Sequence, residues 1–147
     1  MSEKSLLWEL SESVEAPVSR SFAWAFWTNV RNWSDPPATF ALDGPFAEGA
    51  RGTTLMPGEP PRNWTVGDVS PPEQARIEMP LGGAALGFAW RFEGLGEVRT
   101  RITQTVTLWG SAEDRALSEA KEIFRANLPA AMRRIAEAMA TAFTASR

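Results

Sequence analysis

The sequence predicts an α+β fold in which one long C-terminal helix packs against a curved antiparallel sheet. Residues 111–143 repeat apolar side chains with the 3.6-residue period of an amphipathic helix. Residues 6–109 consist mainly of short alternating segments separated by proline- and glycine-rich turns, which is typical of strands. A helix with a broad apolar face needs a broad apolar partner, and a curved sheet is the simplest one that this chain can form.

Composition limits the functions that this chain can serve. The 147 residues carry a net charge of −3 and no run of like charges, which argues against nucleic-acid binding. No stretch is long and apolar enough to span a membrane, and no signal peptide precedes the first strand. We therefore expect one cytoplasmic domain, residues 1–147, without membrane insertion.

Cysteine, histidine and tyrosine are absent from the sequence. Without Cys or His, a zinc, copper, haem or iron–sulfur site would depend on carboxylates or methionine, so we expect neither a metal nor an organic cofactor. Nucleophile systems built on Ser-His-Asp or Cys-His are excluded as well. The sequence does not decide whether the protein is an enzyme, but the absence of Cys and His weighs against an enzymatic function.

The first predicted element is a strand over residues 6–14. Polar and apolar side chains alternate there, so one face is buried and the other exposed. Trp8, Leu10 and Glu12 share the buried face. Burying a carboxylate is costly, so an inward Glu12 needs an arginine partner or stays protonated, and either condition is compatible with a functional site.

Two short helices are predicted next. Pro17 suits the entry to an aromatic helix over residues 18–28, because the N–H that proline lacks is not needed in a first turn. A second helical turn over residues 29–33 ends before Pro36, since a residue that precedes proline is pushed out of the helical conformation.

Six further strands follow, and proline or glycine clusters separate them. They are predicted over residues 39–42, 50–56, 63–69, 75–79, 84–92 and 97–109. The last two form the best-specified hairpin because their alternation is strict, with Gly94-Leu95-Gly96 as the predicted turn.

The final helix has a clear start signal and a predicted bend. Ser111 suits the N-cap, with the negative charges of Glu113 and Asp114 beside it. Pro129 lacks an N–H and crowds the carbonyl of Arg125, which predicts a bend that lets the helix follow the sheet. The predicted apolar stripe comprises Leu117, Phe124, Leu128, Ala131, Ile135, Ala138 and Ala142, with Met132 and Met139 at its flanks.

Several short phrases occur along the chain in a fixed order. They are Glu12–Pro17 before an aromatic helix, Phe46–Gly52 with its glycines, Val66–Pro72, Trp90–Glu93, Thr100–Thr103 and Asn127-Leu128-Pro129. Their order resembles the helix-grip fold of the START-like (SRPBCC) superfamily, of the polyketide cyclase/dehydrase and lipid-transport type. The resemblance implies seven curved antiparallel strands around the long helix, two short helices after the first strand, and an apolar cavity that binds hydrophobic molecules. It does not fix any chemistry.

Residues on the inward faces become candidate walls of that cavity. They are Trp8, Leu10, Trp64, Val66, Ile77, Phe88, Trp90, Ile102, Gln104, Val106, Phe124 and Leu128. The same side chains can instead fill the space as a close-packed core, and the resemblance favours the open cavity. Among the polar residues on these faces, Glu12 and Asp68 are candidate catalytic groups, although Asp68 and Gln104 can also turn to solvent at a bulge.

Three functions fit these observations. Binding of a hydrophobic small molecule, such as a lipid, polyketide or aromatic compound, is favoured. The first alternative is a cofactor-independent cyclase or dehydratase that uses the same cavity. The second is a protein-interaction module resembling heat-shock ATPase activator homologues, for which we expect a filled interior and an exposed apolar patch. The ligand, the pathway and the oligomeric state are not indicated by the sequence.

Overall fold

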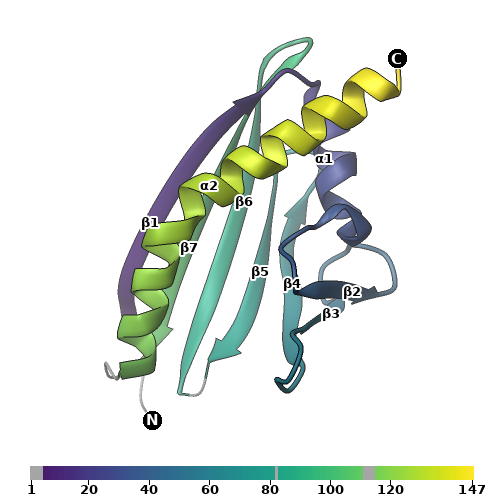
Figure 1. The fold of residues 1–147 in the computed structure, drawn as a ribbon. Helices are drawn as coiled ribbons and strands as arrows, with labels where there is room; N and C mark the ends of the chain where they lie inside the picture. Colours follow the sequence, from purple (N-terminus) through teal and green to yellow (C-terminus); the bar gives the residue numbers. More distant parts are fainter. Residues whose placement is uncertain (1–4, 82, 111–114) are drawn as a thin grey trace.

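A seven-stranded antiparallel sheet curves around one long helix, which is the helix-grip arrangement that the sequence predicts (Figure 1). The computed structural model describes residues 5–81, 83–110 and 115–147. In chain order the elements are β1 (Ser5–Ala16), α1 (Arg20–Thr28), the 3₁₀ turn η1 (Val30–Asn32), β2 (Thr39–Asp43), β3 (Arg51–Leu55), β4 (Arg62–Ser70), β5 (Gln74–Leu81), β6 (Ala84–Gly96), β7 (Arg99–Gly110) and α2 (Arg115–Ala145). The strand order β1-β7-β6-β5-β4-β3-β2 places the first strand beside the last.

The strand β1 shows the predicted alternation over most of its length. Ser11 and Ser13 are exposed, whereas Leu10 and Glu12 are half-buried on the opposite face, toward α2. A bulge next to Leu6 shifts the register of β1 against β7 and leaves Leu6 exposed, although the alternation of this strand places Leu6 on the same face as Trp8 and Leu10.

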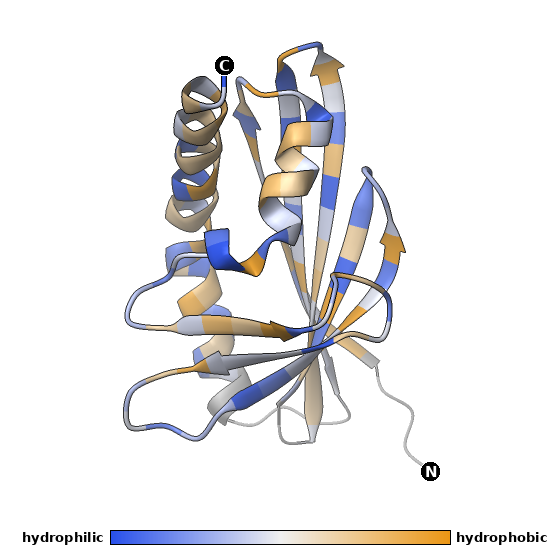
Figure 2. Cartoon of the chain, turned by 90° about the vertical axis from the view of Figure 1, so that its right-hand side faces the viewer, coloured by the Kyte–Doolittle hydropathy of each residue, from blue (hydrophilic) through white to orange (hydrophobic). Residues whose placement is uncertain are grey.

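The helix α1 closes one end of the space between α2 and the sheet. It begins later than predicted because Ser19 caps it, with the Ser19 Oγ accepting a hydrogen bond of 3.2 Å from the Phe22 N–H. Figure 2 shows α1 between the C-terminal half of α2 and the long strands. The rings of Phe22 and Phe143 meet edge to face there, with 4.9 Å between their centroids.

The hairpin of β6 and β7 forms as predicted, but its turn lies further along the chain. Gly96 pairs with Arg99, so the two connecting residues are Glu97 and Val98 rather than Gly94-Leu95-Gly96. A register irregularity between Gly94 and Gly96 absorbs one extra residue, and the ladder therefore continues past the point where the glycines suggested that it would stop.

The helix α2 contains Pro129 near its middle and continues through it. Figure 1 shows the axis of α2 changing direction about midway along its length, as the missing N–H and the crowded carbonyl of Arg125 predict. The predicted N-cap at Ser111 lies outside the described residues. The bend lets the N-terminal half follow β1 while the C-terminal half crosses toward α1.

The buried stripe of α2 is rotated from the predicted one. Its most buried side chains are Leu128, Met132, Ala136 and Met139. Ile135 is only half-buried and Ala138 is exposed, although both were predicted to lie within the stripe. The reason is that β1 is the strand that α2 contacts most, so the predicted stripe centre faces a cleft instead of the sheet.

Candidate functional site

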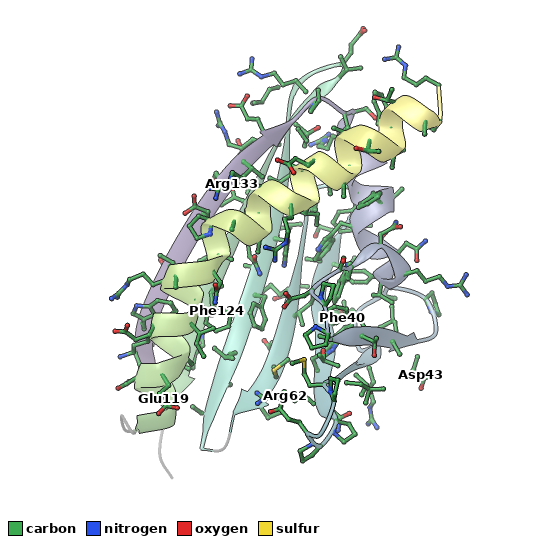
Figure 3. All side chains as sticks on the ribbon, in the orientation of Figure 1. Phe40, Asp43, Arg62, Glu119, Phe124 and Arg133 are labelled. Carbon is green, nitrogen blue, oxygen red and sulfur yellow. The ribbon has the colours of Figure 1, made fainter. Side chains whose placement is uncertain are left out.

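An open cleft of about 1,110 Å³ lies between α2 and the inner face of the sheet. Residues from α1, from the η1–β2 region, from β3 to β7 and from α2 line it. Figure 3 shows Phe124 of α2 and Phe40 of β2 on opposite sides of this space. The interior is therefore hollow on the side of the helix that faces away from β1.

Four tryptophans form one continuous wall of the cleft. Trp64 stacks on Trp33 with 5.3 Å between ring centroids, and Trp33 stacks on Trp27 at 6.0 Å. Trp27 in turn contacts Trp90 at 5.0 Å. All four border the cleft, but Trp27 and Trp64 are only 1% and 2% exposed, so a ligand there would lie mainly against the half-buried rings of Trp33 and Trp90.

Hydrogen bonds hold two of these rings in place. Trp33 Nε1 donates to the carbonyl oxygen of Trp27 at 2.6 Å. Trp64 Nε1 donates to Thr54 Oγ1 at 3.0 Å. Because the polar edge of each indole is already satisfied, both rings are fixed in place and need no reorganisation when a ligand binds. Trp33 is half-buried, whereas Trp64 is packed in the core.

The position of Trp64 depends on a glycine in the neighbouring strand. Gly52 of β3 is the register partner of Trp64, and the indole ring occupies the space that a side chain at residue 52 would need. This contact explains why the sequence has a glycine inside a strand, where glycine is otherwise unfavourable.

The opposite wall is apolar and comes from α2. Its lining side chains are Ile123, Phe124, Leu128, Ala131, Met132 and Ile135. Phe124 meets Phe88 of the sheet edge to face at 5.8 Å, so this pair joins the two walls. Ile123 is 57% exposed, which places apolar surface at the opening of the cleft.

Charged residues are confined to the exposed rim. Asp35, Arg134 and Glu137 line the cleft and are all exposed. Arg134 Nη2 lies 3.7 Å from Asp35 Oδ1, which links α2 to the η1–β2 connection across the opening. Such an exposed pair contributes little to stability, but it marks where water meets the apolar interior.

Gln104 is the buried polar residue among the described residues that line the cleft. It is 9% exposed and lies on the inner face of β7, between the fully buried Ile102 and Val106. The bulge or frayed end that would turn it to solvent does not occur there. No hydrogen bond within the described part of the chain satisfies its side-chain amide.

The predicted wall residues fall into three groups. Those that line the cleft are Trp64, Ile77, Phe88, Trp90, Gln104, Phe124 and Leu128. Val66, Ile102 and Val106 are instead fully buried in the packed core. Trp8 and Leu10 are half-buried and pack against that core, with Trp8 6.5 Å from the Phe124 ring, and neither lines the cleft.

The structure separates the two candidate catalytic carboxylates. Glu12 is half-buried on the inner face beside Gln104, but it does not line the cleft, and the described chain gives it no ion pair with an arginine. Its partial exposure removes the reason to require such a partner. Asp68 lies elsewhere, on the outer face of the sheet.

A bulge between Gly67 and Ser70 turns Asp68 outward. The residue adopts a positive φ of 47°, its side chain is exposed, and its carboxylate lies 3.8 Å from Arg76 in a polar hollow of about 730 Å³. Aspartate tolerates this left-handed conformation better than most residues. The outward alternative at a bulge is therefore the one that the structure shows, and Asp68 does not lie in the cleft.

Several lining residues were not predicted from the sequence. They include Trp27, Trp33, Phe40, Met56, Met79 and Asn127. Met79 continues the period-two pattern of Ile77, so alternation alone was sufficient to find it. Trp33 follows a 3₁₀ turn outside any regular element, and no periodic signal marks such a residue.

The described helices include none that is long and apolar enough to cross a membrane. No protein-family model matches the sequence, and no curated protein matches it either.

Solved structures share the fold. The chain is 14% identical to norcoclaurine synthase from Thalictrum flavum, solved with dopamine and hydroxybenzaldehyde, over 99% of this chain and 89% of that one, with a TM-score of 0.69. It is 10% identical to protein MLL2253 from Mesorhizobium loti over 89% and 96% of the two chains, with a TM-score of 0.71. The di-domain ARO/CYC protein BexL of the BE-7585A biosynthetic pathway is 13% identical with a TM-score of 0.69, and the match covers 89% of this chain and 46% of that one. At these identities the likeness establishes the helix-grip fold alone.

Proposed function

We propose that residues 1–147 form a single START-like (SRPBCC) domain that binds a hydrophobic small molecule in the cleft between α2 and the sheet. The observation that carries the proposal is the wall of Trp27, Trp33, Trp64 and Trp90 facing an open cleft of about 1,110 Å³. Ligand sites are typically apolar clefts of about 300–1,000 Å³ with a few placed polar groups. The ligand class is lipid, polyketide or aromatic, and the proposed location is cytoplasmic.

The size of the apolar lining is sufficient for useful affinity. Burying apolar surface contributes roughly 25 cal/mol per Å². A ligand that buries a few hundred Å² therefore reaches about micromolar affinity after the costs of association. The hydrogen bonds of Trp33 and Trp64 reduce those costs because the wall is already ordered.

A cofactor-independent enzyme of the cyclase or dehydratase type is the second candidate. The solved structures of similar fold include a synthase and an ARO/CYC protein, which favours it. The cleft itself offers carboxylates only at its rim, Asp35 and Glu137, within the part of the chain that the structure describes. Chemistry in the apolar part would then rely on positioning and on Gln104 rather than on a buried acid or base.

Tryptophan fluorescence tests binding directly. Titration with long-chain fatty acids, long-chain alcohols and aromatic phenols is expected to give a saturable change in emission and a higher melting temperature for at least one class. Native mass spectrometry of the freshly purified protein checks for a ligand that co-purifies. If the whole panel leaves both fluorescence and melting temperature unchanged and nothing co-purifies, the binding proposal is wrong and the interaction-module hypothesis gains weight.

A further inference from the structure

Gln104 places a side-chain amide in the cleft to which a purely apolar ligand could not form a hydrogen bond. Its side chain is 9% exposed, and no partner in the described chain bonds its amide. The Gln104 amide atoms are not among the buried unpaired atoms of the described chain, which are Arg76 Nε and Trp109 Nε1, so the amide still reaches the cleft. A purely apolar ligand would take away the water of this amide and give it no hydrogen bond in exchange. The amide also lines the cleft, so a bound molecule is placed to supply the missing hydrogen bond.

The surroundings of Gln104 favour an uncharged partner. Its register neighbours across the sheet are Trp90 on β6 and Glu12 on β1. Arg134 is the only cationic residue among the described lining residues, and it lies on the exposed rim beside Asp35. A carboxylate placed next to Gln104 would therefore lose its water without gaining a counter-ion, and it would lie near the carboxylate of Glu12.

We propose that Gln104 determines the specificity of the cleft. Its amide bonds a hydroxyl or carbonyl group of an otherwise apolar, uncharged ligand, and the site rejects ligands whose buried end is a carboxylate. A glutamine amide both donates and accepts, so it matches either group. This inference rests on the proposed binding function and narrows it, because it selects neutral phenols, alcohols and ketones over fatty acids.

The test uses three probes built on one ring system: 2-naphthol, 2-methylnaphthalene and 2-naphthoate. The methyl group has the shape of the hydroxyl without its hydrogen bond, and the carboxylate adds a charge. Isothermal titration calorimetry is expected to show wild-type protein binding 2-naphthol about 2- to 10-fold more tightly than 2-methylnaphthalene, with 2-naphthoate weakest. In Gln104→Leu the preference for 2-naphthol over 2-methylnaphthalene is expected to disappear.

The matched control is Thr100→Val on the same strand and the same face. Thr100 is fully buried, but its Oγ1 donates to the carbonyl oxygen of Val18 at 2.8 Å and does not line the cleft. This variant is expected to keep the wild-type order of the three probes. Gln104→Met, which keeps the unbranched shape, repeats the test if the leucine variant does not fold.

The outcomes separate the two proposals. If none of the three probes binds the wild type, the proposed binding function fails. If they bind but 2-naphthoate equals 2-naphthol, or if the preference for the hydroxyl survives the loss of the Gln104 amide, binding stands and the specificity role of Gln104 is overturned.

Discussion

The indole ring of Trp64 lies directly over Gly52 in the neighbouring strand. A Cβ built at residue 52 would come within 3.0 Å of the ring, closer than real Cβ atoms approach other atoms. The ring cannot retreat freely, because its Nε1 is bonded to Thr54 and its face is stacked on Trp33. Gly52 therefore leaves the space that the indole ring of Trp64 needs to join the other tryptophans of the wall.

Gly52→Ala is therefore expected to destabilise the protein by about 1–3 kcal/mol, as overpacking of a filled site usually does. Chemical denaturation followed by fluorescence measures the loss, and the emission of the native state should shift as Trp64 moves. Gly67→Ala in β4 is the control, because a Cβ there meets nothing within 4 Å. Equal effects from the two variants would contradict the proposed dependence of Trp64 on Gly52.

A second prediction concerns the stability of the ligand-free protein. Gln104→Leu removes an amide that has no partner, so the free energy of unfolding is expected to stay the same or rise. Thr100→Val removes the hydroxyl that bonds the Val18 carbonyl and is expected to lower it by about 1–3 kcal/mol. Thermal unfolding of both variants gives the comparison. A marked loss in Gln104→Leu would mean that the amide is satisfied in the free protein.

Alternation predicted the strands and most of their faces. The period-two pattern is clearest in β7, where buried residues of the inner face alternate with more exposed residues of the outer face along the strand. The pattern failed where a bulge adds a residue. Asp68 turned outward at such a point, and the glycines around Leu95 became a bulge instead of a turn.

Inward orientation alone does not distinguish core from cleft. Ile102 and Gln104 lie on the same face of the same strand, yet only Gln104 lines the cleft. The difference depends on where α1 and α2 cover the sheet, which is a tertiary property that no local spacing encodes. The same limit explains why the sequence missed Trp33, whose position depends on a hydrogen bond to Trp27.

The third prediction separates the two sides of α2. Met139 is fully buried in the core, so Met139→Ala is expected to cost about 2–5 kcal/mol of unfolding free energy through the cavity it leaves. Ile135, one turn away, is half-buried and lines the cleft, so Ile135→Ala is expected to cost less and to weaken ligand binding instead. Denaturation and titration of both variants measure the two effects. If Ile135→Ala instead lowers the free energy of unfolding more than Met139→Ala does, then Ile135 and not Met139 lies on the packed side of α2.

The last prediction concerns the opening of the cleft, where Ile123 exposes apolar surface on α2. Ile123→Glu places a charge at the entrance of the cleft without disturbing the core, since the side chain is already 57% exposed. Affinity for an apolar probe such as 2-methylnaphthalene is expected to fall several-fold, because the ligand loses apolar contact and the charge keeps water at the entrance. Ala126→Glu is the control on the same helix, since Ala126 is exposed and does not line the cleft. Both variants should fold with nearly the same melting temperature. If they bind the probe equally well, the ligand does not enter past Ile123, and the apolar surface there belongs to some contact other than the cleft.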